Sequence, residues 1–157
     1  MTRDSRHYFK ETDSDKDDSL VNVPLTDYLQ RDFSSKHGIS PHELRNSLVF
    51  YYKNVRVHLW KGSITQLKVD AIINAANSSL MGGGGVDGAI HYAAGPNLKR
   101  ECRKFGGCDT GNAVITKGYN LPSKTVIHTV GPIIYDENKL KPKSLSNCYK
   151  NSFKLCE

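Results

Sequence analysis

An aspartate and a histidine follow a run of four glycines near the middle of the chain, Gly82–Gly85. Asp87 and His91 are four residues apart, so on a helix that begins at the glycines their side chains share one face and can meet. The helix dipole would stabilise an ionised Asp87 in the first turn. Such a carboxylate is suited to orienting or deprotonating an attacking water. The ordinary role of Asp at this position is a helix cap or a first-turn charge, and His91 alone is equally well explained as a polar surface residue.

The glycine run fits one of three phosphate-binding patterns better than the others. A Walker A loop is excluded, because Val86 and Asp87 stand where it needs lysine and a hydroxyl residue. A dinucleotide pattern G-x-G-x-x-G is present, but four residues (78–81) separate the preceding strand from it. The remaining pattern is an anion-binding loop at a helix N-terminus, with the backbone of Gly83, Gly84 and Gly85 against a phosphate. A flexible surface turn is the structural alternative.

Alternating strand and helix patterns surround this loop and predict an α/β fold with helices on both faces of a mostly parallel sheet. Apolar alternation or continuous apolar runs indicate strands, and Gly95, Pro96 and Gly106 mark helix ends. The expected strands are 55–62, 69–77, 113–119 and 125–132, and the expected helices are 86–95, 96–106 and 144–157. His128 lies in an apolar strand and is expected to be a hydrogen-bonded core histidine, while Trp60 and Tyr92 are expected to pack.

Residues 1–54 are expected to form an N-terminal extension to a domain spanning 55–157. Residues 1–20 are polar and typical of disorder. Two short helices are predicted, at Val23–Phe33 and at Ser40–Tyr52, the second from a capping box that begins with Ser40 and Pro41. The chain has neither a signal-peptide pattern nor an apolar run of the ~18 residues that a membrane span needs. We therefore expect a soluble protein of the cytoplasm or nucleus.

Charge and cysteine content limit the partners. Residues 55–157 carry 14 Lys and Arg against 7 Asp and Glu, which suits a nucleotide or a nucleic acid, although charge alone favours an ordinary solvated surface. The four cysteines form no C-x-x-C pair, so reduced thiols are expected and a metal site is not.

The blocks "WKGSITQLKVDAIINAANSSLMGGGGVDGAIHYAAGP" and "GCDTGNAVITKGYNLPSKTVIHTVGP" resemble the macrodomain family, and within it the MacroD-type hydrolase branch. The resemblance runs from about Val55 to the end of the chain. It implies a three-layer α/β/α sandwich with a mixed, mostly parallel sheet, and a cleft that binds ADP-ribose. It further implies hydrolysis of the ester between mono-ADP-ribose and acidic side chains of proteins, deacetylation of O-acetyl-ADP-ribose, and a monomer without cofactor or metal.

The resemblance also implies roles for individual residues. Asp87 would be the catalytic carboxylate, as a base or as a group that orients water, His91 would be its supporting partner, and Asn77 would contact the distal ribose. Asn74 would be structural or support the site from behind. Backbone amides at the glycine loop, Gly85 and Val86 above all, would hold the diphosphate, and that of Ile64 would lie near the adenine.

Two departures from the family pattern affect these expectations. Ser63 stands where the family has an Asp that binds the adenine amino group, so we expect roughly tenfold weaker affinity for ADP-ribose, since a neutral acceptor is worth less than a charged one. A second phosphate loop, S-T/A-G-x-Y-G, and the strands around it are not in the sequence. This suggests a C-terminally truncated or functionally impaired domain. A reader module that binds ADP-ribose without turnover, and a nucleic-acid-binding or structural fragment, are the alternatives.

Overall fold

The computed structural model describes residues 20–22, 48–133 and 142–157. The helix predicted at Val23–Phe33 lies outside these residues, as does the first part of the one predicted at Ser40–Tyr52. The described strands and helices, in chain order, are β1 (Leu20–Asn22), β2 (Leu48–Tyr52), β3 (Val55–Leu59), the 3₁₀ turn η1 (Ile64–Gln66), β4 (Ala71–Ala76), α3 (Gly85–Ala94), α4 (Pro96–Arg103), β5 (Ala113–Lys117), β6 (Thr125–Val130) and α5 (Pro142–Lys154).

The N-terminal sheet corrects one prediction. Residues 48–52, expected to end a helix, form β2, which pairs antiparallel with β3 in a hairpin and with β1 on its other side. The run LVFYY is rich in β-branched and aromatic residues, which favour strands, and pairing with β3 decides the outcome. The hairpin crosses the predicted boundary at 54/55, and that boundary stays a prediction.

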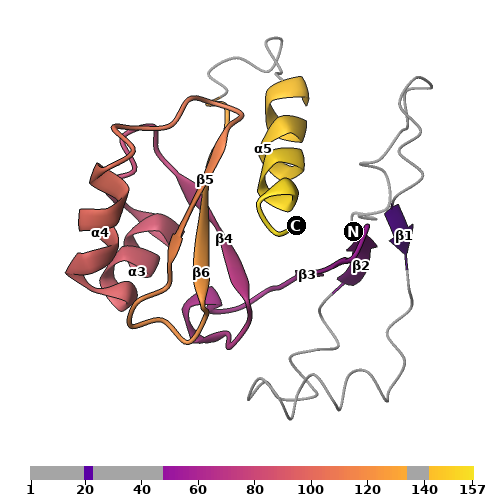
Figure 1. Ribbon diagram of the computed structural model, residues 1–157, viewed down its shortest axis with the longest axis horizontal. Coiled ribbons are helices and arrows are strands. Elements are labelled where there is room, and N and C mark those ends of the chain that lie inside the picture. Colours follow the sequence, from indigo (N-terminus) through magenta and orange to yellow (C-terminus); the bar gives the residue numbers. More distant parts are fainter. Residues whose placement is uncertain (1–19, 23–47, 134–141) are drawn as a thin grey trace, which may run out of the picture.

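The central sheet has the order β4-β6-β5. Strands β4 and β6 are parallel, with Asn74 opposite His128, whereas β5 and β6 are antiparallel. The predicted mixed sheet is therefore confirmed, with one pairing of each kind in the described central sheet. Helices α3 and α4 cover one face and α5 lies on the other, which gives the three layers of an α/β/α sandwich (Figure 1).

The face under α3 and α4 carries the main core. Ile90, Leu98 and Val126 are completely buried in it, and Met81 packs against its edge. Helix α3 ends at Gly95 and α4 begins at Pro96, as predicted. The prediction that Tyr92 packs against the core is wrong, because 91% of this residue is exposed on α3. The prediction for Trp60 is confirmed, because it packs against Leu67.

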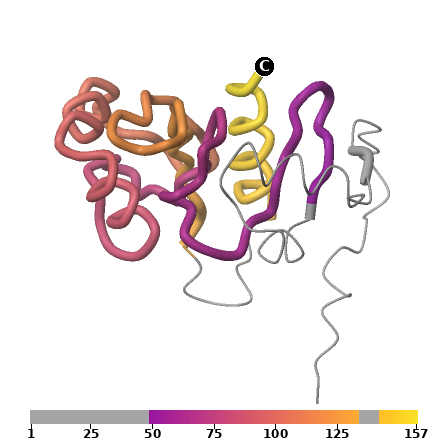
Figure 2. The backbone as a smooth tube through the Cα atoms, turned by 90° about the horizontal axis from the view of Figure 1, so that it is seen from below, coloured from indigo at the N-terminus to yellow at the C-terminus, as the bar shows by residue number. Residues whose placement is uncertain are grey.

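Helix α5 lies between the two sheets (Figure 2). It buries Cys148, Ser152 and Phe153, while the apolar side chains of Leu145 and Tyr149 are about half exposed. The ring of Phe153 lies 5.1 Å from that of Tyr52 and 6.1 Å from that of Phe50, both in β2. Among the described helices, none has the length and apolar character needed to cross a membrane.

Candidate functional site

The glycine run forms the entry to α3 and places Asp87 in the first helical turn. Gly84 is the N-cap, and Gly85, the first helical residue, has φ 60°, a conformation that glycine adopts without strain. Gly88 is required by contact, since a Cβ there would lie 2.4 Å from the carbonyl oxygen of Gly83. The loop thus folds back tightly onto its helix, and Asp87 is only 4% exposed.

The two carboxylate oxygens of Asp87 have different surroundings. Oδ1 accepts a hydrogen bond of 2.7 Å from Nδ2 of Asn74, whereas Oδ2 is buried and has no hydrogen-bond partner. His91 Nε2 lies 3.6 Å from Oδ1, within ion-pair range but beyond a good hydrogen bond. The carboxylate is therefore positioned mainly by Asn74, with His91 beside it. Burial lowers the pKa of His91, and the opposing effect of Asp87 does not outweigh it.

Asn77 shapes the loop that leads to the glycines. Its Oδ1 accepts hydrogen bonds from the backbone N–H and the hydroxyl of Ser79, at 3.1 and 2.6 Å. Its Nδ2 donates to the carbonyl of Gly82 at 2.8 Å. Because an amide nitrogen carries two hydrogens, one donor of Asn77 remains.

Asn77 and Asp87 border the same space in front of Gly83. A Cβ built on Gly83 would lie 3.3 Å from Asn77 Nδ2 and 3.4 Å from Asp87 Oδ2, while Cβ atoms on Gly84 and Gly85 would meet nothing within 4 Å. A donor, an unpartnered carboxylate oxygen and bare backbone therefore meet at one point. The neighbouring Val86 is 41% exposed, so its side chain does not close the loop as a packed residue would.

The residues predicted near the adenine lie on η1, which packs against α3. Ser63 is exposed and caps no backbone N–H of this turn. Its hydroxyl is 3.0 Å from that of Thr65. Ile64 is half-buried against the edge of the core. The fold thus brings the candidate residues onto α3, β4 and the segments beside them, while the role of each stays a prediction.

A buried polar group behind Asp87 was missed as part of the site. His128, expected only to be a satisfied core residue, is fully buried and hydrogen-bonded, which confirms that expectation. Its Nδ1 lies 3.1 Å from Asn74 Nδ2, the same nitrogen that holds Asp87. Burial, with His91 adding to it, lowers the pKa of His128 to about 4, against the opposing effects of Asp87 and Glu101. The imidazole is therefore neutral at pH 7.

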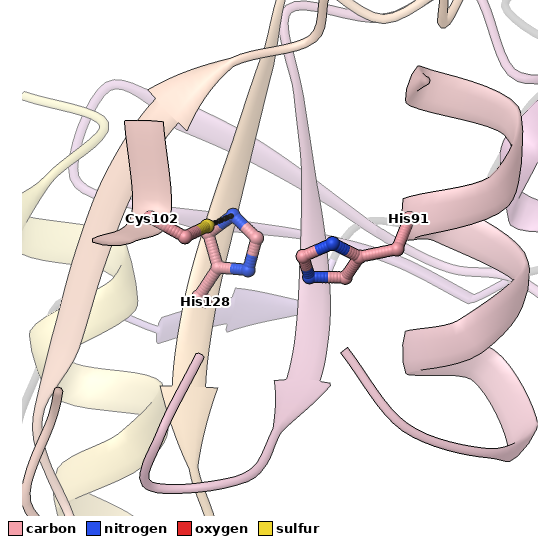
Figure 3. A group of neighbouring side chains, drawn as sticks. All are labelled: His91, Cys102 and His128. Carbon is pink, nitrogen blue, oxygen red and sulfur yellow. Dashed lines mark hydrogen bonds between the residues drawn. The ribbon is translucent and has the colours of Figure 1, made fainter. Parts of the chain in front are cut away.

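His91, Cys102 and His128 approach one another closely enough to suggest a metal site, with one ligand atom of each within 4.8 Å of the others (Figure 3). Their chemistry does not fit this use. His128 Nε2 lies 3.0 Å from Thr116 Oγ1, so that nitrogen is already engaged. The pKa of Cys102 is raised to about 11, first by burial and then by Glu101 and Asp87, which opposes the thiolate that a metal needs.

A separate cavity of about 460 Å³ lies between the loop after α4 and α5, lined among others by Cys108, Asp109 and Asn151. None of the predicted site residues lines it. The space at Gly83, bordered by the unpartnered buried Oδ2 of Asp87, is therefore the better candidate site.

Comparison with known proteins identifies the family. The Macro domain family model matches residues 73–157, more than half of the chain. This chain belongs to the Macro domain family, and its relatives include MacroD-type members. It is 62% identical over 101 residues to the human ADP-ribose glycohydrolase MACROD2, covering 64% of this chain and 24% of that protein. It is 57% identical over 106 residues to an O-acetyl-ADP-ribose deacetylase of Escherichia fergusonii, covering 65% of this chain and 60% of that protein.

One solved structure of similar sequence is a complex with ADP-ribose. The Trypanosoma brucei macrodomain in complex with ADP-ribose is 51% identical, with a TM-score of 0.57 over 61% of this chain and 39% of that one. Our chain spans less than two thirds of the length of each of these three proteins.

Proposed function

We propose that this macrodomain binds ADP-ribose and hydrolyses the ester that joins mono-ADP-ribose to acidic side chains of proteins, as well as O-acetyl-ADP-ribose. The ligand of the Trypanosoma brucei relative and the names of the human and Escherichia fergusonii relatives support this proposal. In it, the backbone at Gly83, Gly84, Gly85 and Val86 holds the diphosphate, because N–H groups at a helix N-terminus attract anions. Ser63 and Ile64 lie at the adenine end.

The observation that carries the proposal is the unpartnered Oδ2 of Asp87. A buried polar atom without a hydrogen bond costs about 1–3 kcal/mol, and such exceptions need an explanation. This oxygen lies at the space in front of Gly83, which Asn77 Nδ2 also borders. A ribose and a water molecule in that space would supply the missing donor.

The reaction follows from that position. For the ester with a protein side chain, Oδ2 accepts a hydrogen bond from a water. This hydrogen bond directs a lone pair of the water oxygen at the anomeric carbon of the ribose. The water oxygen bonds to that carbon, the bond to the ester oxygen breaks, and the acidic side chain leaves as a carboxylate. The proton released by the water goes to Asp87 or to the diphosphate of the substrate. Asn74 holds Oδ1 meanwhile, which keeps Oδ2 aimed.

Turnover and binding can be tested separately with Asp87→Asn and Gly83→Ala. The substrate is a mono-ADP-ribosylated protein with a radioactive label, and ADP-ribose affinity is measured by calorimetry. General acid–base groups contribute about 10²–10⁴-fold to rate, so Asp87→Asn should slow label release at least a hundredfold with affinity kept within a few-fold. Gly83→Ala should weaken binding as well, because its methyl group enters the space between Asn77 and Asp87.

Three outcomes would overturn the proposal or its mechanism. If the unaltered chain binds ADP-ribose but releases no label, it is a reader module. If it binds RNA with steep salt dependence that excess ADP-ribose does not affect, the basic surface is its functional site. Undiminished label release by Asp87→Asn would remove Asp87 from the mechanism.

A further inference from the structure

A chain of buried hydrogen bonds leads from the proposed catalytic carboxylate across one face of the sheet. Asp87 Oδ1 is 2.7 Å from Asn74 Nδ2, which is 3.1 Å from His128 Nδ1. On the other side of the ring, His128 Nε2 is 3.0 Å from the hydroxyl of Thr116, which donates to the carbonyl of Val126 at 3.4 Å. Each side chain in it is at most 4% exposed.

The strand register creates this chain. Asn74 of β4 and His128 of β6 are direct partners in the parallel pairing, so their side chains stand next to each other on the face under α3 and α4. Thr116 of β5 is paired with Val126, two residues before His128, and reaches the ring diagonally on the same face. Three strands therefore supply the groups behind one helical carboxylate.

The direction of every hydrogen bond is determined by chemistry. A carboxylate only accepts, so Asn74 must present its amide nitrogen to Asp87. That nitrogen has no lone pair to offer, so His128 Nδ1 must be the acceptor of its second hydrogen. The ring proton is then on Nε2, which donates to Thr116. One tautomer of a neutral His128 is compatible with every hydrogen bond of this chain.

We propose that His128 is a positioning residue for Asp87: as the neutral Nε2–H tautomer, held by Thr116, it fixes the amide of Asn74, which in turn fixes the carboxylate with Oδ2 free at Gly83. This inference rests on the proposed function and identifies further residues of the same site. The other tautomer would set an Nδ1–H against the amide hydrogen of Asn74, and the doubly protonated ring would do the same.

The surroundings of His128 keep it neutral. His91 and Asp87 face it from α3, and Cys102 and Glu101 from α4. The two carboxylates favour a charged ring, yet burial and His91 prevail. Cys102 Sγ, at 3.7 Å from Nε2, is a weak second acceptor for the same proton.

Ring-nitrogen NMR tests the tautomer without reference to catalysis. The full chain is labelled with ¹⁵N, and the His128 signals are assigned by their loss in His128→Asn. We expect an acceptor-type Nδ1 and a protonated Nε2 at pH 7, unchanged at pH 6. A protonated Nδ1, or a charged ring at pH 6, would overturn the proposal.

Two variants of Thr116 test the mechanical step. Thr116→Val keeps the shape of the side chain but removes the acceptor for Nε2–H, whereas Thr116→Ser retains it. We expect Thr116→Val to lower kcat about five- to tenfold with the KM little changed, since one neutral hydrogen bond is of that worth, and Thr116→Ser to restore it. Thr129→Val is the matched control, because Thr129 lies on the other face of β6 and bonds to Asn112; its kcat should equal that of the unaltered chain.

The outcomes separate this inference from the proposed function. If the unaltered chain turns over and Thr116→Val matches it in kcat, His128 has only a packing role. If kcat falls in all three variants alike, the effect is general loss of structure and the proposal is also overturned. If the unaltered chain shows no turnover, the proposed function fails, and the tautomer in Thr116→Val decides: a shift of the proton toward Nδ1 supports the hydrogen-bond chain, and no shift overturns it.

Discussion

The two faces of the central sheet differ in how completely they are covered. Under α3 and α4, Ile72 and Val126 are at most 3% exposed, and the polar groups Asn74 and His128 are fully buried. On the opposite face α5 packs on β5 and β6 and Ile127 of β6 is also fully buried, but Ile73 of β4 is only half-buried. We call the face under α3 and α4 the closed face, and the residues of the proposed reaction lie on it.

Burial explains this placement. In a closed face a hydrogen-bond chain is protected from water, and an unpartnered carboxylate oxygen has no competing donor until a ligand or its attacking water supplies one. In a half-open face the same groups would exchange partners with water. The closed face therefore combines tight packing with several buried polar atoms that lack a hydrogen-bond partner, among them Asp87 Oδ2 and both ring nitrogens of His91.

Two adjacent isoleucines measure the difference in packing. Ile72→Ala should lower the free energy of unfolding by about 3–4 kcal/mol, because a fully buried chain leaves a cavity. Ile73→Ala, on the opposite face of the same strand, should cost about half as much or less, since it is partly in solvent. Urea unfolding followed by circular dichroism gives both values. Equal losses would show that the two faces are packed alike.

The buried His128 makes the stability of the folded chain depend on pH. Its pKa in the folded state, about 4, lies below the unfolded value near 6.5, so the unfolded state binds more protons between these values. Stability is therefore complete above pH 6.5 and falls as the pH drops toward 4, by about 3 kcal/mol in all. His91, whose pKa is also lowered, acts in the same direction.

His128→Asn is the control for this effect. It should be less stable at pH 7 but should lose less of its remaining stability between pH 6.5 and pH 4.5. Urea unfolding at several pH values measures this slope. An unaltered slope in the variant would assign the acid sensitivity to other groups.

The contact between the glycine loop and α3 can be strained by one methyl group. Gly88→Ala should destabilise the chain by about 2 kcal/mol, because the new atom overlaps the carbonyl of Gly83 and overpacking costs of this order are typical. Gly84→Ala, whose methyl group would meet nothing within 4 Å, should leave stability almost unchanged. Thermal unfolding compares the two. A destabilised Gly84→Ala would mean that the loop is tighter than its contacts indicate.

The smallest expected effect lies outside the closed face, at the exposed Ser63. Ser63→Asp should strengthen ADP-ribose binding about tenfold, or ~1.4 kcal/mol, because a charged acceptor binds an amino group more strongly. The hydroxyl of Ser63 is also close to that of Thr65, so it is not fully available to a ligand. Calorimetry at fixed salt measures the change. An affinity equal to that of the unaltered chain would show that Ser63 does not contact the adenine.

Local patterns were enough to predict most of the central domain. Apolar runs located β4 and β6, and Gly95 with Pro96 located the junction of α3 and α4. The four-residue spacing of Asp87 and His91 correctly placed both on one helix, 3.6 Å apart. These predictions succeed because each depends on only a few consecutive residues.

Features that depend on strand pairing could not be predicted. The hydrogen bonds among Asn74, Thr116 and His128 need the register of three strands, which one sequence does not contain. The capping box at Ser40 predicts a helix through residues 48–52, because the pairing of this segment with β1 and β3 is not visible in its own sequence. The residue roles, the monomeric state and the cellular location stay predictions.

Helix α5 gives the molecule an order of assembly. The β2–β3 hairpin leaves the ribosome early, yet its aromatic side chains, Phe50 and Tyr52, rest on Phe153 of α5. During translation the rings of Phe50 and Tyr52 therefore cannot contact Phe153 until α5 has been synthesised.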